Sequence, residues 1–73
     1  MTIKNIKDVA KIIKDTRKKQ GLTQAELAGA SGVGVRFIVD LENGKETCQI
    51  DKTLRIIKML GISINVELPE GDK

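Results

Sequence analysis

In the middle of the sequence a turn separates two short helical patterns. This feature constrains the fold more than any other feature of the sequence. Thr23 begins the sequence TQAE, a capping box in which a Thr hydroxyl and a Glu carboxylate three residues later satisfy free amides at a helix start. Three glycines within the next few residues then mark a tight turn. A second helical pattern follows and stops at Asn43-Gly44. We therefore predict two short helices, over residues 23–30 and 34–43.

Helical periodicity also extends on both sides of this central part. Asn5 followed by Asp8 is typical of a helix N-cap with an acid in the first turn, and apolar residues then recur at helical spacing. A fourth pattern of this kind precedes the C-terminal part. We predict further helices over residues 6–20 and 49–60. The side chains expected to face the core are Ile6, Val9, Ala10, Ile13, Leu27, Ala28, Phe37, Ile38, Leu41, Ile50, Leu54 and Ile57.

Arg17 continues the apolar stripe of the first predicted helix, which places a charge at the edge of the core. An unpaired charge in such a position is costly, so it needs an acidic partner from another element. Glu42 lies four residues after Ile38, at the border of the buried face of the third predicted helix. We therefore predict a structural ion pair between Arg17 and Glu42.

Residues 62–68 alternate apolar and polar side chains, which is the period of a half-buried strand, and Pro69 ends the pattern. No other part of the sequence has a strand pattern, and a lone strand leaves its backbone groups unpaired. We predict antiparallel pairing with the same strand of a second copy; addition to a sheet of a different protein is the alternative. The side chains expected at the dimer contact are Ile62, Ile64, Val66 and Leu68.

The composition excludes several classes of function. The chain has 73 residues, which make one small domain, with no His and a single Cys. These counts exclude a Cys/His zinc site within one chain and both Ser-His-Asp and Cys-His catalysis. A lone Cys is typical of a reduced intracellular protein, and no apolar run approaches the roughly 18 residues of a membrane helix. We expect a cytoplasmic protein that is not an enzyme and has no cofactor, metal, small-molecule substrate or membrane contact.

Positive charge is concentrated near the N-terminus. The net charge is +3, but residues 1–20 alone hold seven Lys or Arg against two Asp. Four of these lysines, Lys7, Lys11, Lys14 and Lys18, share one face of the first predicted helix. A basic domain with one aromatic residue suits phosphate contacts better than base stacking. This face is typical of a solvated helix surface, and a contact to DNA or to an acidic partner is the alternative.

Two short helices joined by a glycine-bearing turn form a helix-turn-helix arrangement. Its characteristic residues are Gly21-Leu22-Thr23-Gln24, Glu26-Leu27-Ala28, Gly32-Val33, Ile38 and Leu41-Glu42-Asn43-Gly44-Lys45. On these residues, positions 21–45 resemble the DNA-binding motif of the phage-repressor (Xre/Cro) family. With the flanking helices and the C-terminal strand, the whole chain resembles HipB-like antitoxins. The resemblance implies an all-α, lambda-repressor-like bundle of four helices over residues 1–61. It also implies a β-strand over 62–68 that pairs across a homodimer, followed by a flexible tail over 69–73.

The resemblance also implies which residues meet DNA, and it includes the Arg17–Glu42 ion pair. Arg36 matches a base-reading position, and a guanidinium can bond guanine O6 and N7 together. Asp40 either accepts from cytosine N4 or orients Arg36. Gly34 and Val35 depart from the polar residues more usual at this helix start. The implied DNA contacts are Gln24, Val35, Arg36, Val39, Asp40, Asn43 and Lys45.

The function implied by the resemblance is that of a transcriptional repressor acting as the antitoxin of a type II toxin-antitoxin system. Such a protein binds double-stranded DNA at a palindromic operator as a homodimer, and its second partner is a HipA-like kinase toxin. Two alternatives stay open. Gly34 and Val35 favour a protein-interaction module with weak or no DNA binding. A stand-alone phage or restriction-system regulator would bind DNA without a toxin.

Overall fold

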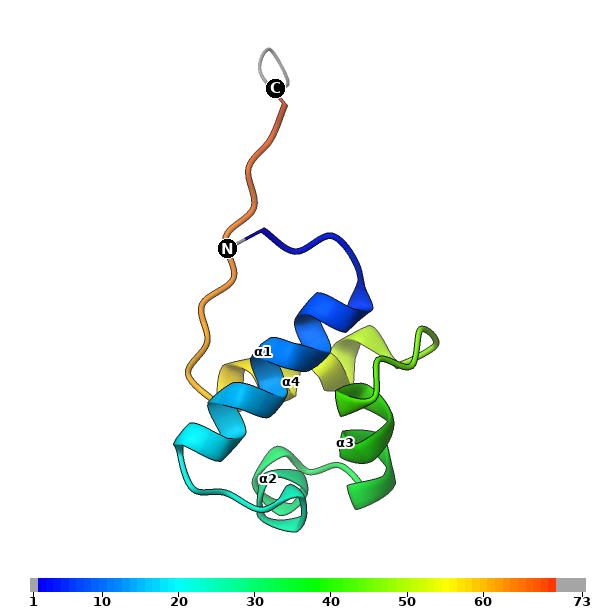
Figure 1. The fold of residues 1–73 in the computed structure, drawn as a ribbon, viewed down its shortest axis with the longest axis vertical. Coiled ribbons are helices and arrows are strands. Elements are labelled where there is room, and N and C mark those ends of the chain that lie inside the picture. The colour runs from blue at the N-terminus through cyan, green and yellow to red at the C-terminus, as the bar shows by residue number, and fades with distance from the viewer. Residues whose placement is uncertain (1, 70–73) are drawn as a thin grey trace.

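Four helices follow one another in the computed structural model, which describes residues 2–69 (Figure 1). Each helix end lies within one residue of the limit predicted from the sequence. The all-α, four-helix prediction is therefore confirmed for the described residues. The helices are α1 (Ile6–Lys19), α2 (Gln24–Ser31), α3 (Val35–Glu42) and α4 (Ile50–Met59).

Local capping explains where α1 and α2 begin and where α2 ends. The Asn5 side chain accepts hydrogen bonds from the amides of Lys7 and Asp8 at the start of α1. The capping box at the start of α2 is complete, because Thr23 and Glu26 each accept a hydrogen bond from the other's backbone amide. Gly32 ends α2 with φ at +69°, a left-handed conformation that favours glycine.

The core lies where α2 packs against α3 and α4 and where α1 packs against α3. α1 and α3 each contribute apolar side chains at helical spacing, as the sequence predicts. Phe37, Ile6 and Val9 are half-buried and pack at the margin of this core. The apolar side chains that are completely buried are Ile13, Leu27, Ile38, Leu41 and Ile56.

The side that α4 turns to the core differs in part from the one that its apolar pattern predicts. Ile50 and Leu54 were expected to be buried but are 66% and 44% exposed. Ile57 is buried, as predicted, and Thr53 and Ile56 take the other inward positions. The Thr53 hydroxyl donates to the Gln49 carbonyl at 2.9 Å, so the buried hydroxyl has a partner. Apolar side chains of α4 are consequently left at the surface.

The predicted strand over residues 62–68 is absent from the described chain, which has no strand anywhere in residues 2–69. These residues instead extend away from the helices (Figure 1). The physical reason is that a strand needs a neighbour to pair with, and a single copy supplies none. Ile62 packs at the edge of the core, whereas Ile64, Val66 and Leu68 are exposed. Of the predicted tail over 69–73, residues 70–73 lie outside the described residues.

Within residues 2–69, the helices lack the combination of length and apolarity that crossing a bilayer requires.

Candidate nucleic-acid interface

α3 presents an outward face beside the turn that follows α2. Ile38 and Leu41 are three residues apart, so they share the side of the helix that is buried. Arg36 lies off that side and is exposed, and Val35 is also exposed because it stands at the first position of the helix. Of the other predicted DNA contacts, Val39, Asp40 and Gln24 are half-buried, and Asn43 and Lys45 are exposed.

Asp40 lies between two cations on this outward face. Its Oδ1 is 3.4 Å from Arg36 Nε, and its Oδ2 is 3.5 Å from Lys45 Nζ. The Asp40 side chain is 22% exposed, whereas the Arg36 side chain is 85% exposed. The carboxylate therefore sits at the helix surface while the guanidinium extends into solvent. Of the two roles open for Asp40, this geometry favours the orientation of Arg36.

The structure brings Arg17 and Glu42 together in a buried ion pair. Arg17 Nε is 2.6 Å from Glu42 Oε2, and Nη2 is 3.1 Å from Oε1. Arg17 Nη1 also donates to the Leu22 carbonyl at 2.7 Å. Hydrogen bonding to Glu42 raises the pKa of Arg17 above its ordinary value, and this effect outweighs the opposing effect of burial. The pair fixes the end of α3 against α1.

Gln24 joins this ion pair, which the sequence pattern does not indicate. Its Nε2 donates to Glu42 Oε1 at 3.1 Å, so the first residue of α2 is tied to the last residue of α3. No local signal predicts this contact, because the two residues are 18 positions apart and lie on different helices. The Gln24 side chain, which the resemblance implies contacts a phosphate or a nearby base, is thus held in place by the ion pair.

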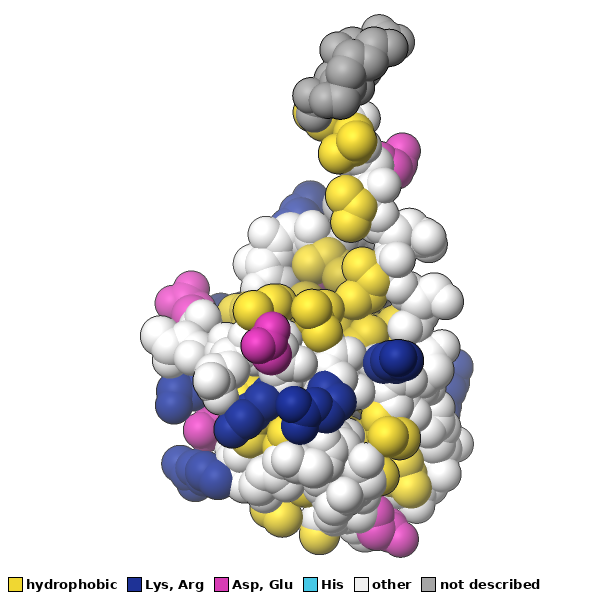
Figure 2. Space-filling model, turned by 180° about the vertical axis from the view of Figure 1, so that it is seen from behind, with side chains coloured by type: hydrophobic (Ala, Val, Ile, Leu, Met, Phe, Trp, Pro, Cys, Tyr) yellow, Lys and Arg dark blue, Asp and Glu magenta, His cyan; other side chains and the backbone are white. Residues whose placement is uncertain are grey.

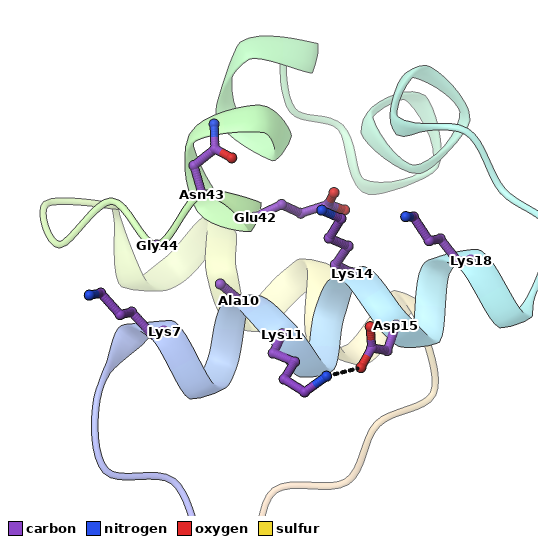
Figure 3. Close-up of a pocket in the computed structure, with 9 residues that line it drawn as sticks. All are labelled: Lys7, Ala10, Lys11, Lys14, Asp15, Lys18, Glu42, Asn43 and Gly44. Atoms are coloured by element: carbon purple, nitrogen blue, oxygen red, sulfur yellow. Dashed lines mark hydrogen bonds and ion pairs between the residues drawn. The ribbon is translucent and has the colours of Figure 1, made fainter.

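The turn after α3 rests on the start of α1. Gly44 has φ at +78°, and a Cβ on this residue would lie 3.3 Å from Lys7 Cγ, so the close approach favours glycine. An open groove of about 440 Å³ runs from this turn along α1 (Figure 3). We call it the lysine groove. Its lysines share one face of α1, as the sequence predicts, whereas no sequence pattern indicates its opposite wall. Its basic and turn residues are Lys7, Lys11, Lys14, Lys18, Asn43 and Gly44.

The described residues offer no metal-binding cluster. Residues 2–69 contain no group of three or more His, Cys, Asp or Glu side chains that could hold a metal ion. Cys48 is half-buried, and desolvation raises the pKa of its thiol above the ordinary value. The thiol is therefore protonated at neutral pH and is a poor nucleophile.

Comparison with known proteins identifies relatives of this chain. A family model described as helix-turn-helix, HTH_3, matches residues 13–66. An uncharacterised HTH-type transcriptional regulator, y4mF of Sinorhizobium fredii, is 51% identical over 67 residues, covering 92% of this chain and 88% of the relative. The ImmF control region 10 kDa protein of Bacillus phage phi105 is 33% identical over 60 residues, covering 82% of this chain and 67% of the relative.

Solved structures of HipB have the same fold. The chain in a HipB-O1-O2 complex superposes with a TM-score of 0.83 at 26% identity, covering 90% of this chain and 96% of that one. The chain in a HipA-HipB-O2-O3 complex superposes with a TM-score of 0.85 at 24% identity, covering 96% of this chain and 99% of that one. The resemblance to HipB-like proteins noted in the sequence is confirmed.

Proposed function

The chain belongs to the helix-turn-helix family HTH_3, and we propose that it is a sequence-specific DNA-binding transcriptional repressor. The observation that carries the proposal is the outward face of α3, where Arg36 extends into solvent beside Asp40. A helix with one exposed face of this kind fits the major groove of B-DNA. A cytoplasmic location is part of the proposal, because a regulator must reach its DNA.

Each residue of this face has a proposed role. Arg36 bonds a guanine, and Val35 and Val39 contact thymine methyl groups. Gln24, at the free amides of the α2 start, binds a phosphate when DNA is present. Asn43 and Lys45 hold the backbone beside the turn after α3. Gly34 has no side chain that could cap α3, and Val35 has no polar group. The start of α3 therefore offers bases few hydrogen-bonding groups besides those of Arg36 and Asp40.

A homodimer built by the C-terminal segment is the second part of the proposal. Ile64, Val66 and Leu68 are exposed, and so are Ile50 and Leu54 on α4. Figure 2 shows hydrophobic side chains gathered below and along the segment that leaves the helices. Antiparallel pairing of residues 62–68 with a second copy would cover this surface and satisfy the backbone. Two α3 helices placed roughly 34 Å apart would then read a palindromic operator.

The antitoxin role is the third part, and its support is the fold shared with HipB, which has been solved in a complex with HipA. The proposed second partner is a HipA-like kinase toxin. The relative from Bacillus phage phi105 favours a second candidate function, a stand-alone phage regulator without a toxin. Binding of the purified protein to a HipA-like kinase encoded next to it would separate the two.

Selection of DNA from a randomised duplex library tests the central proposal. The wild-type protein should enrich a palindrome, and Arg36→Ala should lose discrimination at one position of each half-site by roughly 1–3 kcal/mol, or about 10- to 100-fold. Arg55→Ala is the matched control, because it removes the same charge from an exposed position on α4. If the wild-type protein enriches no sequence and shifts no duplex at low salt, the chain is a protein-interaction module instead.

A further inference from the structure

We propose that the lysine groove binds the sugar–phosphate backbone of the same duplex, outside the bases that α3 reads. This inference rests on the proposed function and extends it with a second contact surface. Figure 3 shows Lys7, Lys14 and Lys18 projecting from α1 on the side that carries Asn43 at the end of α3. The groove thus opens beside the turn that is proposed to hold the backbone.

The groove continues past that turn. A second open depression, of about 590 Å³, lies between the start of α1 and the loop before α4. It shares Lys7 and Gly44 with the lysine groove and is also lined by Lys45. The two depressions therefore form one path from the proposed DNA-binding face to the far end of α1.

Three ammonium groups on this path have no acidic partner among the described residues. Within residues 2–69, Lys7, Lys14 and Lys18 form no ion pair, whereas Lys11 Nζ is 3.0 Å from Asp15 Oδ2. The Glu42 carboxylate also lines the groove, but its oxygens already accept from Arg17 and Gln24. Glu46, which lines the second depression, is also outside any ion pair within residues 2–69. Three free ammonium groups therefore face one free carboxylate, and the path keeps a net positive charge that an anion can neutralise.

The spacing of these lysines fits a polyanion. Lys7 and Lys18 are eleven positions apart, which is roughly 16 Å along a helix that rises about 1.5 Å per residue. One DNA strand carries a phosphate about every 3.4 Å along the duplex axis. Lysines spread over this length can therefore meet several phosphates of one strand.

The lining favours DNA over an acidic protein. Stable protein interfaces depend on buried aromatic or large apolar anchors. The apolar residues on this path are Ala10 and Ile6, and it has no aromatic side chain. Lysine is a flexible point charge that suits phosphates without fixed geometry. The groove thus supplies charge without the apolar centre that a protein partner needs.

The salt dependence of DNA binding tests the proposal on the full chain. The variant Lys7→Gln/Lys14→Gln/Lys18→Gln should lower the slope of log K against log salt by roughly 0.9 for each lost phosphate contact, hence about 3 per subunit. The probe is the duplex that the wild-type protein enriches from the randomised library. Base preference should stay unchanged, because these lysines touch no base. Trimming base pairs outside the palindrome should weaken the wild-type protein but not the variant.

The matched control is Lys4→Gln/Lys19→Gln/Lys58→Gln, which removes the same charge from exposed positions outside both depressions. Urea unfolding of both variants verifies that they fold. If the groove variant keeps the slope of the control, the proposal is wrong. An unchanged slope together with lost binding to poly-L-glutamate would assign the groove to an acidic protein. A wild-type protein that binds no duplex would contradict the proposed DNA-binding function itself. Failure of the groove proposal alone would instead leave DNA binding intact and change only the comparison between the two variants.

Discussion

Arg17 Nε lies 2.6 Å from Glu42 Oε2, and this contact joins α1 to the last residue of α3. The two side chains are 9% and 2% exposed, so the pair is almost completely removed from water. Gln24 donates to the same carboxylate from the first residue of α2. The placement of α3, and with it the placement of Arg36, therefore depends on Glu42.

Removing one member of this pair should destabilise the protein strongly. Glu42→Ala leaves the Arg17 charge buried without an acidic partner, and the free energy of unfolding should fall by roughly 3–5 kcal/mol. The double variant Arg17→Met/Glu42→Leu should lose less, because no buried charge remains. Urea unfolding at pH 7 measures both. A double variant less stable than Glu42→Ala would contradict this account.

An exposed pair provides the comparison for that experiment. Lys11 and Asp15 also form an ion pair, but their side chains are largely exposed. Lys11→Ala should change the free energy of unfolding by no more than about 1 kcal/mol, because water screens an exposed pair. A loss as large as that of Glu42→Ala would mean that burial is not the cause.

Asp40→Asn should weaken base discrimination without abolishing DNA binding. The carboxylate holds Arg36 and Lys45, so its neutralisation frees both side chains. We expect a smaller loss of discrimination than in Arg36→Ala, at the same base position, and tighter binding to random duplexes because a negative charge near the phosphates is gone. The duplex selection measures both. Loss of preference at a different base position would show that Asp40 reads a base itself.

Val66→Lys should weaken the proposed dimer, whereas Asn65→Lys should not. Successive residues of a strand point to opposite faces, so only position 66 shares the apolar face with Ile64 and Leu68. Loss of a buried Val side chain costs roughly 1.5–3 kcal/mol, or more than about tenfold in the dimer dissociation constant. Light scattering across a concentration series measures the dimer dissociation constant.

Deletion of residues 62–68 should give a monomer or an unfolded chain, and an intact dimer would exclude this segment from the interface.

Glu26 should contribute to the pH dependence of stability. Its carboxylate accepts the Thr23 amide at 2.8 Å, and this hydrogen bond lowers the pKa of Glu26 below the ordinary value of 4.5. A carboxyl with a lowered pKa in the folded state stabilises the protein above the ordinary pKa, and this stabilisation is lost as the pH falls through the lowered value.

Glu26→Gln isolates that effect, because the amide oxygen can still accept from Thr23 while the charge is gone. Below about pH 4.5 the variant should lose less stability on acidification than the wild-type protein. Urea unfolding between neutral pH and pH 3 measures the difference. Parallel curves for the two proteins would show that Glu26 does not contribute.

The amino-acid sequence alone determined the helix limits and the helix-turn-helix arrangement. The reason is that capping is local: Asn5 and Thr23 bond amides within three residues of themselves. It also indicated the partner of Arg17, because a charge on a buried stripe requires an acid at a comparable position on another helix. Both conclusions rest on short-range geometry or on a single strong energetic requirement.

Only the tertiary structure decided which side of α4 faces inward and what lies opposite the lysines of α1. Apolar side chains surround much of α4, so its sequence allows several buried faces, and packing against α2 selects Thr53 and Ile56. The lysine groove likewise needs Asn43 and Gly44, which are distant from Lys14 and Lys18 in the chain. A helical period shows which residues share a face, but only long-range packing determines what that face meets.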